Sequence, residues 1–188
     1  MQQLEIALKK VFDRIGNDYV LPQGEFITDD FGNGNQIRNP FYGQTPSKLK
    51  FMFGTQKELN IWLATTTDKY PLVWLVYPFF ESYNNNSQSF YTYKKVRLVF
   101  AINNDADKLV QTRLQTTRFI LDQLTARFTE LMRNSKFKKF ILIDKQVDIK
   151  EKFWPNYSEK DQKESGTVDV WDAISFDCDL HLIPNCIK

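Results

Sequence analysis

The sequence predicts an α+β fold in which an antiparallel sheet packs against a long helix and shorter helices on one of its faces. Three observations lead to this prediction: a continuous apolar segment at 72–77, alternating segments at 91–102 and 170–182, and a long amphipathic segment ending near Arg133. Strand pairs around one long helix are typical of α+β layers. Because 188 residues can bury a sizeable core, we expect a single domain over 1–188.

The chain is predicted to open with a helix and continue into a long irregular segment. Apolar residues recur at helical spacing on one face of the helix: Leu4, Leu8, Val11 and Ile15. Gly16 follows as a helix stop. From 21 to 46 the sequence is rich in glycine, proline and asparagine, and Asn33 and Gly34 favour a hairpin turn. Since so long a connection in a compact domain is usually functional, we predict that 21–46 is an extended loop or arm.

The next elements alternate between short strands and a short helix. Residues 49–53 are typical of a strand, and a capping-box motif beginning at Thr55 predicts a short helix. The apolar run 72–77 lies between two prolines and predicts a central strand that is covered on both faces. The polar run 81–89 that follows predicts a projecting hairpin tip.

Asn104 is predicted to cap the longest helix, which ends in basic residues near Arg133. A strand at 141–149 and a polar excursion at 151–166 then precede the closing strand 170–182. The alternation assigns one set of closing-strand residues to the core: Ile174, Phe176, Cys178, Leu180 and Leu182. It assigns the other set to the opposite, polar face: Ala173, Ser175, Asp177, Asp179 and His181.

The charge, the cysteines and the first residues of the chain predict a protein of a reducing cytoplasm. The formal net charge is +2, which is far from the strongly basic balance of a dedicated nucleic-acid-binding domain. The two cysteines do not form a secreted disulfide framework. The first residues lack a signal-peptide pattern, and the longest apolar run is too short to span a bilayer. We therefore expect no membrane association.

Motifs for catalysis and metal binding are weak. His181 is the only histidine, and Cys178, three residues before it on a predicted strand, points to the opposite face. The segment Gly32 to Gly34 lacks the later residues of a phosphate-binding loop. We expect no metal site, no cofactor and no enzymatic activity.

One enzyme class stays open as an alternative. Asp148 and Lys150 after Asp144 imitate the acid-x-Lys pattern of restriction-type nucleases. With 23 acidic residues and 18 lysines in 188 positions, however, about two acid-x-Lys triplets are expected by chance. The sequence contains two, and the second begins at Asp161. The alternatives to a structural role are therefore a nuclease-like DNA-processing enzyme and a soluble interaction module of unknown partner.

Aromatic residues make up 15% of the chain, more than an ordinary core of this size needs, so some of them are expected at interfaces. The candidate interface residues lie in the arm, at the hairpin tip, off the core stripe of the long helix and on the polar face of the closing strand: Phe26, Phe31, Phe41, Tyr42, Tyr83, Asn85, Phe119, Asp177, Asp179 and His181.

The strand segments 71–76 and 96–102, the long helix and the closing segment 170–176 together resemble the tail-terminator and tail-completion proteins of tailed bacteriophages, including the neck ring proteins of crAss-like phages. The resemblance covers roughly 56–183 and lies in element order and hydrophobic pattern. Compared with a minimal terminator, the segments 21–46 and 151–166 are long.

The resemblance implies a structural virion protein without catalytic activity. Such a subunit forms a homo-oligomeric ring, six- or twelve-fold, in the phage neck or tail connector. It joins portal-side and tail-side components, so neighbouring portal, neck or tail ring proteins are the implied partners. The implied localisation is the host cytoplasm during assembly and then the virion. A non-specific contact with DNA in the ring lumen stays open.

Overall fold

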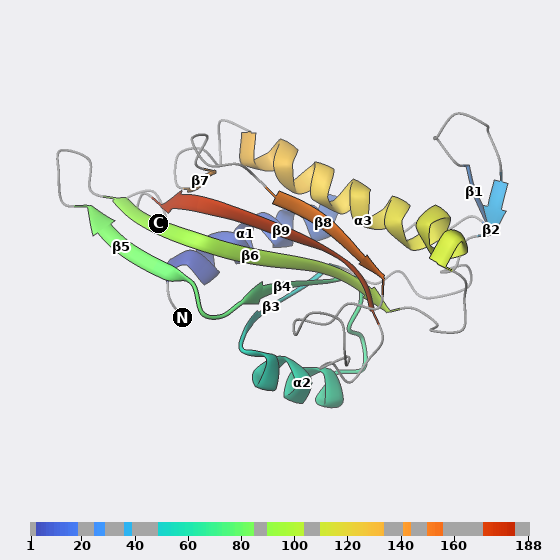
Figure 1. Ribbon diagram of the computed structural model, residues 1–188, viewed down its shortest axis with the longest axis horizontal. Helices are drawn as coiled ribbons and strands as arrows, with labels where there is room; N and C mark the ends of the chain where they lie inside the picture. The colour runs from blue at the N-terminus through green and yellow to red at the C-terminus, as the bar shows by residue number, and fades with distance from the viewer. Residues whose placement is uncertain are drawn as a thin grey trace.

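The computed structural model describes residues 3–18, 25–28, 36–38, 49–84, 90–103, 110–133, 141–143, 150–155 and 171–182. Its helices are α1 (Gln3–Asp18), α2 (Gln56–Thr65) and α3 (Val110–Arg133). Its strands are β1 (Phe26–Thr28), β2 (Gln36–Arg38), β3 (Lys50–Gly54), β4 (Leu72–Val76), β5 (Phe80–Asn84), β6 (Phe90–Asn103), β7 (Ile141–Ile143), β8 (Lys150–Pro155) and β9 (Trp171–Leu182). Figure 1 shows their arrangement.

Seven of the strands form one sheet around the long strands β6 and β9. The order is β3-β4-β6-β9-β7, with β5 pairing with β6 and β8 pairing with β9. β9 pairs along almost the whole length of β6, so β4 and β5 share the other side, where β5 pairs with the first half of β6 and β4 with the second half. β8 and β7 likewise follow one another along the outer side of β9. The predicted α+β class is confirmed.

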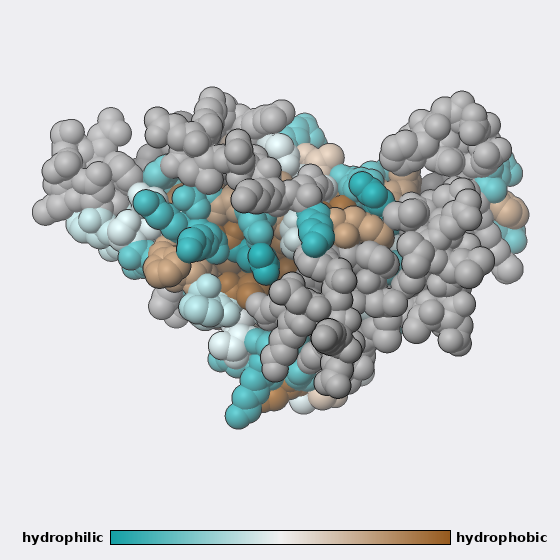
Figure 2. Space-filling view, viewed as in Figure 1, coloured by the Kyte–Doolittle hydropathy of each residue, from teal (hydrophilic) through white to brown (hydrophobic). Residues whose placement is uncertain are grey.

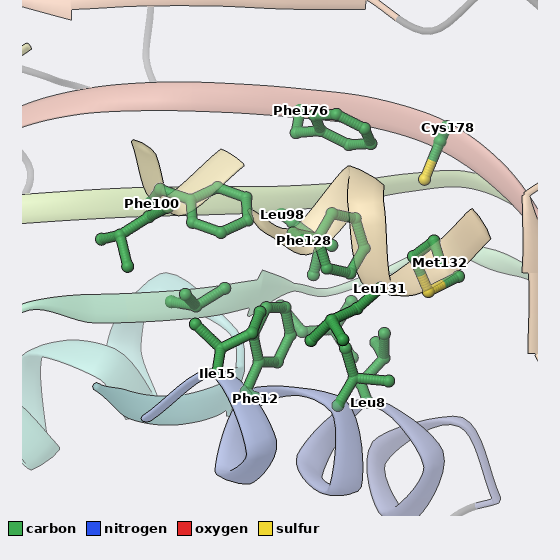
Figure 3. Close-up of a cluster of buried hydrophobic side chains, with 14 of the residues drawn as sticks. Leu8, Phe12, Ile15, Leu98, Phe100, Phe128, Leu131, Met132, Phe176 and Cys178 are labelled. Atoms are coloured by element: carbon green, nitrogen blue, oxygen red, sulfur yellow. The ribbon is translucent and has the colours of Figure 1, made fainter. Parts of the chain in front are cut away.

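The main core lies between one face of this sheet and the helices α1 and α3. Phe12 of α1 stacks on Phe128 of α3 with ring centroids 5.3 Å apart, and Phe128 meets Phe176 of β9 edge to face at 5.4 Å. Figure 3 shows these rings between the helices and the strands β6 and β9. Much of the high aromatic content is therefore core packing, which benefits from edge-to-face and offset ring pairs.

The prediction that all helices pack on one face is wrong for α2. Leu59 and Leu63 of α2 pack on the opposite face, against Trp74 of β4 and Trp171 of β9. Trp74 Nε1 also donates a 3.0 Å hydrogen bond to the Gly54 carbonyl. α2 connects β3 to β4, which pair in parallel, so the sheet is not wholly antiparallel. A crossover helix between two parallel strands must lie on one face of the sheet, and here that face is the one that α1 and α3 leave open.

Local sequence signals locate most of the elements. α1 begins and ends near its predicted limits, and its apolar face is buried. The capping box is formed, because Thr55 accepts from the Glu58 backbone and Glu58 accepts from the Thr55 backbone. β4 is buried along its whole length, as predicted for a strand that is covered on both faces. The predicted cap Asn104 lies outside the described residues.

Two strand limits differ from the prediction. β8 occupies 150–155, most of which the sequence assigns to a polar excursion. Its pairing with β9 stabilises it, with Phe153 opposite Ile174. At the predicted hairpin tip, 81–84 belong to β5, because each of these residues has a register partner on β6. Residues 85–89 lie outside the described part of the chain.

The predicted arm contains a small hairpin. β1 and β2 pair antiparallel, with Phe26 opposite Arg38, and form a separate two-stranded sheet. Figure 1 shows this hairpin just beyond the N-terminal end of α3, at one extremity of the longest axis of the molecule. Glu25, just before β1, is also described, and the remaining residues of 21–46 lie outside the described part of the chain.

The closing strand β9 follows its predicted alternation over its second half. Phe176, Cys178 and Leu180 are buried in the main core, whereas Asp177 and Asp179 are half-buried on the other face. In the first half both faces are buried, including Ala173 and Ser175 on the face opposite the main core. Ala173 belongs to the second cluster under α2, which covers this end of the sheet.

Candidate interaction surface

One end of the molecule is formed by β5 and the first half of β6. Phe80 and Tyr83 of β5 are 64% and 51% exposed. Within the described residues, β5 pairs only with β6, so its other edge has no strand partner there. Figure 1 shows the β1–β2 hairpin at one end of the longest axis, and β5 runs out to the other end. An open edge with exposed rings is a template for contact with another chain.

A β-bulge interrupts β6 beside β5. The register moves from Tyr93 opposite Leu180 to Val96 opposite Cys178, so that Lys94 and Lys95 together face Asp179. Lys95 has φ +56°, in the left-handed region that residues other than glycine rarely adopt. A bulge of this kind re-aims a side chain relative to a regular strand.

Asp179 satisfies the backbone at the bulge. Its Oδ1 accepts a 2.8 Å hydrogen bond from the Lys95 N–H, a group that a regular ladder would pair with a carbonyl. The bulge places Lys95 Nζ over the exposed Phe80 ring, 5.2 Å from its centroid. That distance lies within the range of a cation–π interaction. Lys94 beside it is also exposed. We call Phe80, Lys94 and Lys95 the bulge surface.

The same sheet face continues as a row of paired polar groups. Arg97 holds Asp177 through two hydrogen bonds of 2.8 and 3.1 Å. Thr92 Oγ1 lies 3.1 Å from His181 Nδ1. Figure 2 shows hydrophilic side chains gathered over β6 and β9 on this face. The structure thus brings the predicted residues Asp177, Asp179 and His181 together with cationic and hydroxyl partners from β6.

On the opposite face of the same end, aromatic rings adjoin two carboxyl groups. Tyr83 packs on Tyr91 with centroids 4.8 Å apart. The Tyr93 hydroxyl is hydrogen-bonded to Glu81, and burial together with the charges of Glu81 and Glu5 raises the pKa of Tyr93. This cluster lies under the first turn of α1, where Glu5 is located.

Glu5 is fully buried, and neither of its carboxylate oxygens has a hydrogen-bond partner within the described part of the chain. Burial raises the pKa of Glu5 above its ordinary value, and the charge of Glu81 raises it further. An unpaired buried carboxylate disfavours the ionised form. Glu5 therefore disfavours the packing of α1 at neutral pH.

The β1–β2 hairpin carries the exposed groups of the opposite end. Phe26 is 51% exposed, and Glu25 before it is exposed as well. Among the described residues, four large hydrophobic side chains are exposed, and three of them lie at these two ends; the fourth is Ile61 on α2. Isolated exposed apolar residues are ordinary, but three exposed rings on two terminal strand elements make these two ends candidate contact surfaces.

The other predicted interface residues have varied placements. Phe119 is half-buried and packs against the main core. Four of them lie outside the described residues: Phe31, Phe41, Tyr42 and Asn85. Sequence reasoning missed Phe80 and Lys95, because the exposure of Phe80 and the bulge depend on register with distant strands. It also missed Glu5, although the spacing of Glu5, Leu8 and Phe12 places all three on one helical face.

The metal-binding, nuclease-like and membrane-spanning features that the sequence disfavours can be compared with the described residues. Within the described residues, no set of three or more His, Cys, Asp or Glu side chains could hold a metal ion. Asp144 and Asp148 of the nuclease-like pattern lie outside those residues. None of the helices that the structure describes combines the length and apolar character needed to cross a membrane.

Comparisons with protein-family models, with curated protein sequences and with solved structures found no match for this chain.

Proposed function

We propose that the chain is a structural subunit that assembles with identical copies into a closed ring in the neck or tail connector of a bacteriophage, as a tail-terminator or head–tail completion protein. The observation that carries this proposal is the placement of exposed aromatic residues on strand elements at opposite ends of the longest axis: Phe26 at one end, Phe80 and Tyr83 at the other.

Two different contact surfaces at opposite ends favour head-to-tail association. In such a heterologous contact, each copy offers one surface to the copy before it and the other surface to the copy after it. The association gives a closed ring when the rotation between neighbours closes, and an open filament when it does not. A two-fold dimer would need only one self-complementary surface. The two distinct ends therefore favour head-to-tail association over a two-fold dimer, and a closed ring is the form of it that we propose.

The resemblance in element order to phage tail-terminator and neck ring proteins supports the location that we propose. On this proposal the ring has six or twelve copies, and its partners are portal, neck or tail ring proteins above and below it. The chain assembles in the host cytoplasm and remains in the virion. Its role is structural, so the purified chain is expected not to cleave DNA with Mg²⁺ or Mn²⁺; cleavage abolished by Asp148→Ala would favour the nuclease alternative.

The mass of the purified chain in solution tests whether copies associate at all. Size-exclusion chromatography with light scattering is expected to give six or twelve times the chain mass of 22.2 kDa. A mass of one chain at all concentrations tested would contradict the proposal. Because contacts between exposed charges are screened by salt, the measurement is best made at low and at physiological ionic strength.

A further inference from the structure

We infer that neighbouring copies join when the β1–β2 hairpin of one copy docks on the bulge surface of the next. This inference rests on the proposed ring and names the two surfaces that meet in it. The bulge surface is thus occupied by a second copy of this chain. That copy presents its β1–β2 hairpin, with Glu25 just before β1 and Phe26 as the first residue of β1.

The bulge surface has the chemistry to receive an acidic, aromatic segment. It combines an exposed ring, Phe80, with the ammonium groups of Lys94 and Lys95, both of which are exposed. The Lys95 ammonium lies over the Phe80 ring, so one incoming group can contact the ring edge and the charge together. Apolar area gives affinity, and the cations select for negative charge.

The bulge is held in place before any partner arrives. Lys95 has a left-handed backbone, which is unfavourable for a residue with a Cβ, and the Asp179 carboxylate accepts its N–H at 2.8 Å. Without this bulge, Lys95 would alternate with Lys94 across the sheet as in a regular strand. The strained backbone at Lys95 thus places a cation beside the exposed Phe80 ring.

The β1–β2 hairpin has the complementary character. Among the described hairpin residues, 25–28 and 36–38, Glu25 is the acidic one and Arg38, opposite Phe26, is the basic one. Glu25 and Phe26 are exposed at the start of β1. The exposed carboxylate of Glu25 beside the exposed Phe26 ring therefore complements the two ammonium groups and the ring of the bulge surface.

The placement of the two surfaces makes the contact one between copies. The hairpin lies at one extremity of the longest axis and β5 lies towards the other, so the hairpin of one copy does not reach the bulge surface of that same copy (Figure 1). Each copy then donates one hairpin and accepts one hairpin, and the same contact repeats around the ring.

The first test removes the charge of Lys95 while preserving its backbone. Lys95→Asn is suited to this, because asparagine tolerates the left-handed conformation better than most residues. We expect the subunit–subunit dissociation constant, measured by analytical ultracentrifugation, to rise about tenfold, with the melting temperature of the dissociated subunit unchanged. Lys57→Asn is the matched control, since Lys57 is an exposed lysine on α2, and it is expected to assemble like the parent.

The second test reverses charge on both sides of the contact. Glu25→Lys alone and Lys95→Glu alone are each expected to weaken assembly, and the double variant is expected to restore it. Single variants that assemble like a ring-forming parent would overturn the inference and leave the proposed function standing. Weakened single variants without restoration in the double variant would also overturn the pairing. A parent that never associates would overturn the proposed function itself, and the inference with it.

Discussion

The backbone N–H of Lys95 donates a 2.8 Å hydrogen bond to Oδ1 of Asp179, across the β6–β9 pair at the point where their register shifts. A side chain on one strand thus completes the hydrogen bonding of a bulge on its neighbour. The contact links the residue that presents the exposed cation to the polar face of the closing strand. This hydrogen bond gives a specific reason for an aspartate at position 179, whereas solvation of a strand face would favour any polar residue there.

Asp179→Ala is expected to lower the free energy of unfolding of the isolated subunit by about 1 kcal/mol, because the Lys95 N–H loses a charged acceptor at a partly exposed site. Asp179→Asn retains an oxygen acceptor and is expected to lose less. Urea denaturation of the dissociated subunit measures both. The control is Asp177→Ala, which removes a half-exposed ion pair with Arg97 and is expected to cost about 0.5 kcal/mol. Equal losses for the two alanine variants would contradict the special role of Asp179.

Two glycine substitutions in the bulge are expected to have opposite effects. Lys95→Gly relieves a left-handed backbone and should raise the free energy of unfolding by about 0.5 kcal/mol. Lys94→Gly, one residue earlier, gains no such relief and should lower it by about 0.5 to 1 kcal/mol through chain entropy. Thermal and urea unfolding of the two variants provide the comparison. Destabilisation of the same size at both positions would show that Lys95 is unstrained.

Glu5→Met is expected to stabilise the subunit at pH 7 by about 1 to 2 kcal/mol, because it replaces a buried unpaired carboxylate with an apolar side chain of similar length. The folded-state pKa of Glu5 is raised, chiefly by burial. A raised pKa means that its stabilising protonated form is fully present below the ordinary pKa of 4.5 and is lost as the pH rises through the folded-state pKa.

The difference between Glu5→Met and the parent should therefore shrink as the pH falls from 7 towards 4.5. Urea midpoints measured across this range test the pH dependence. Asp13→Asn on the exposed side of α1 serves as the control, and its effect is expected to be small at every pH. A pH-independent difference for Glu5→Met would mean that Glu5 does not titrate in this window.

Phe176→Ala is expected to cost about 3 to 5 kcal/mol, because the Phe176 ring is buried between Phe100 and Phe128 in the main core. Such a loss is a large share of the stability of a domain. A fall in the melting temperature and in soluble yield would report it. A loss below about 1 kcal/mol would contradict the register of β9, in which Phe176 faces α3.

The strands of the central sheet could be predicted because their signals are local. The apolar run at 72–77 and the alternation along 91–102 and 170–182 depend on the faces that those residues present. Burial confirms the core assignments of Phe176, Cys178 and Leu180. The face that α2 covers could not be predicted in the same way. It depends on the crossover between β3 and β4, a relationship between elements.

The candidate surface was less predictable than the fold. Tyr83 and Phe26 could be named from composition and position, and both are exposed. Lys95 could not, because its bulge arises only when β6 pairs with β9 and two lysines meet one aspartate. β8 was missed for a similar reason, since its pairing with β9 outweighs the polar character of its sequence.

Negative-stain electron microscopy of the purified chain tests the central claim most directly, because it distinguishes a closed ring from both a monomer and an open filament. The account predicts closed rings of six or twelve copies, with rotational symmetry in the class averages, that fall apart in the Lys95→Glu variant. Particles of single-chain size, or open filaments without closed rings, would contradict it.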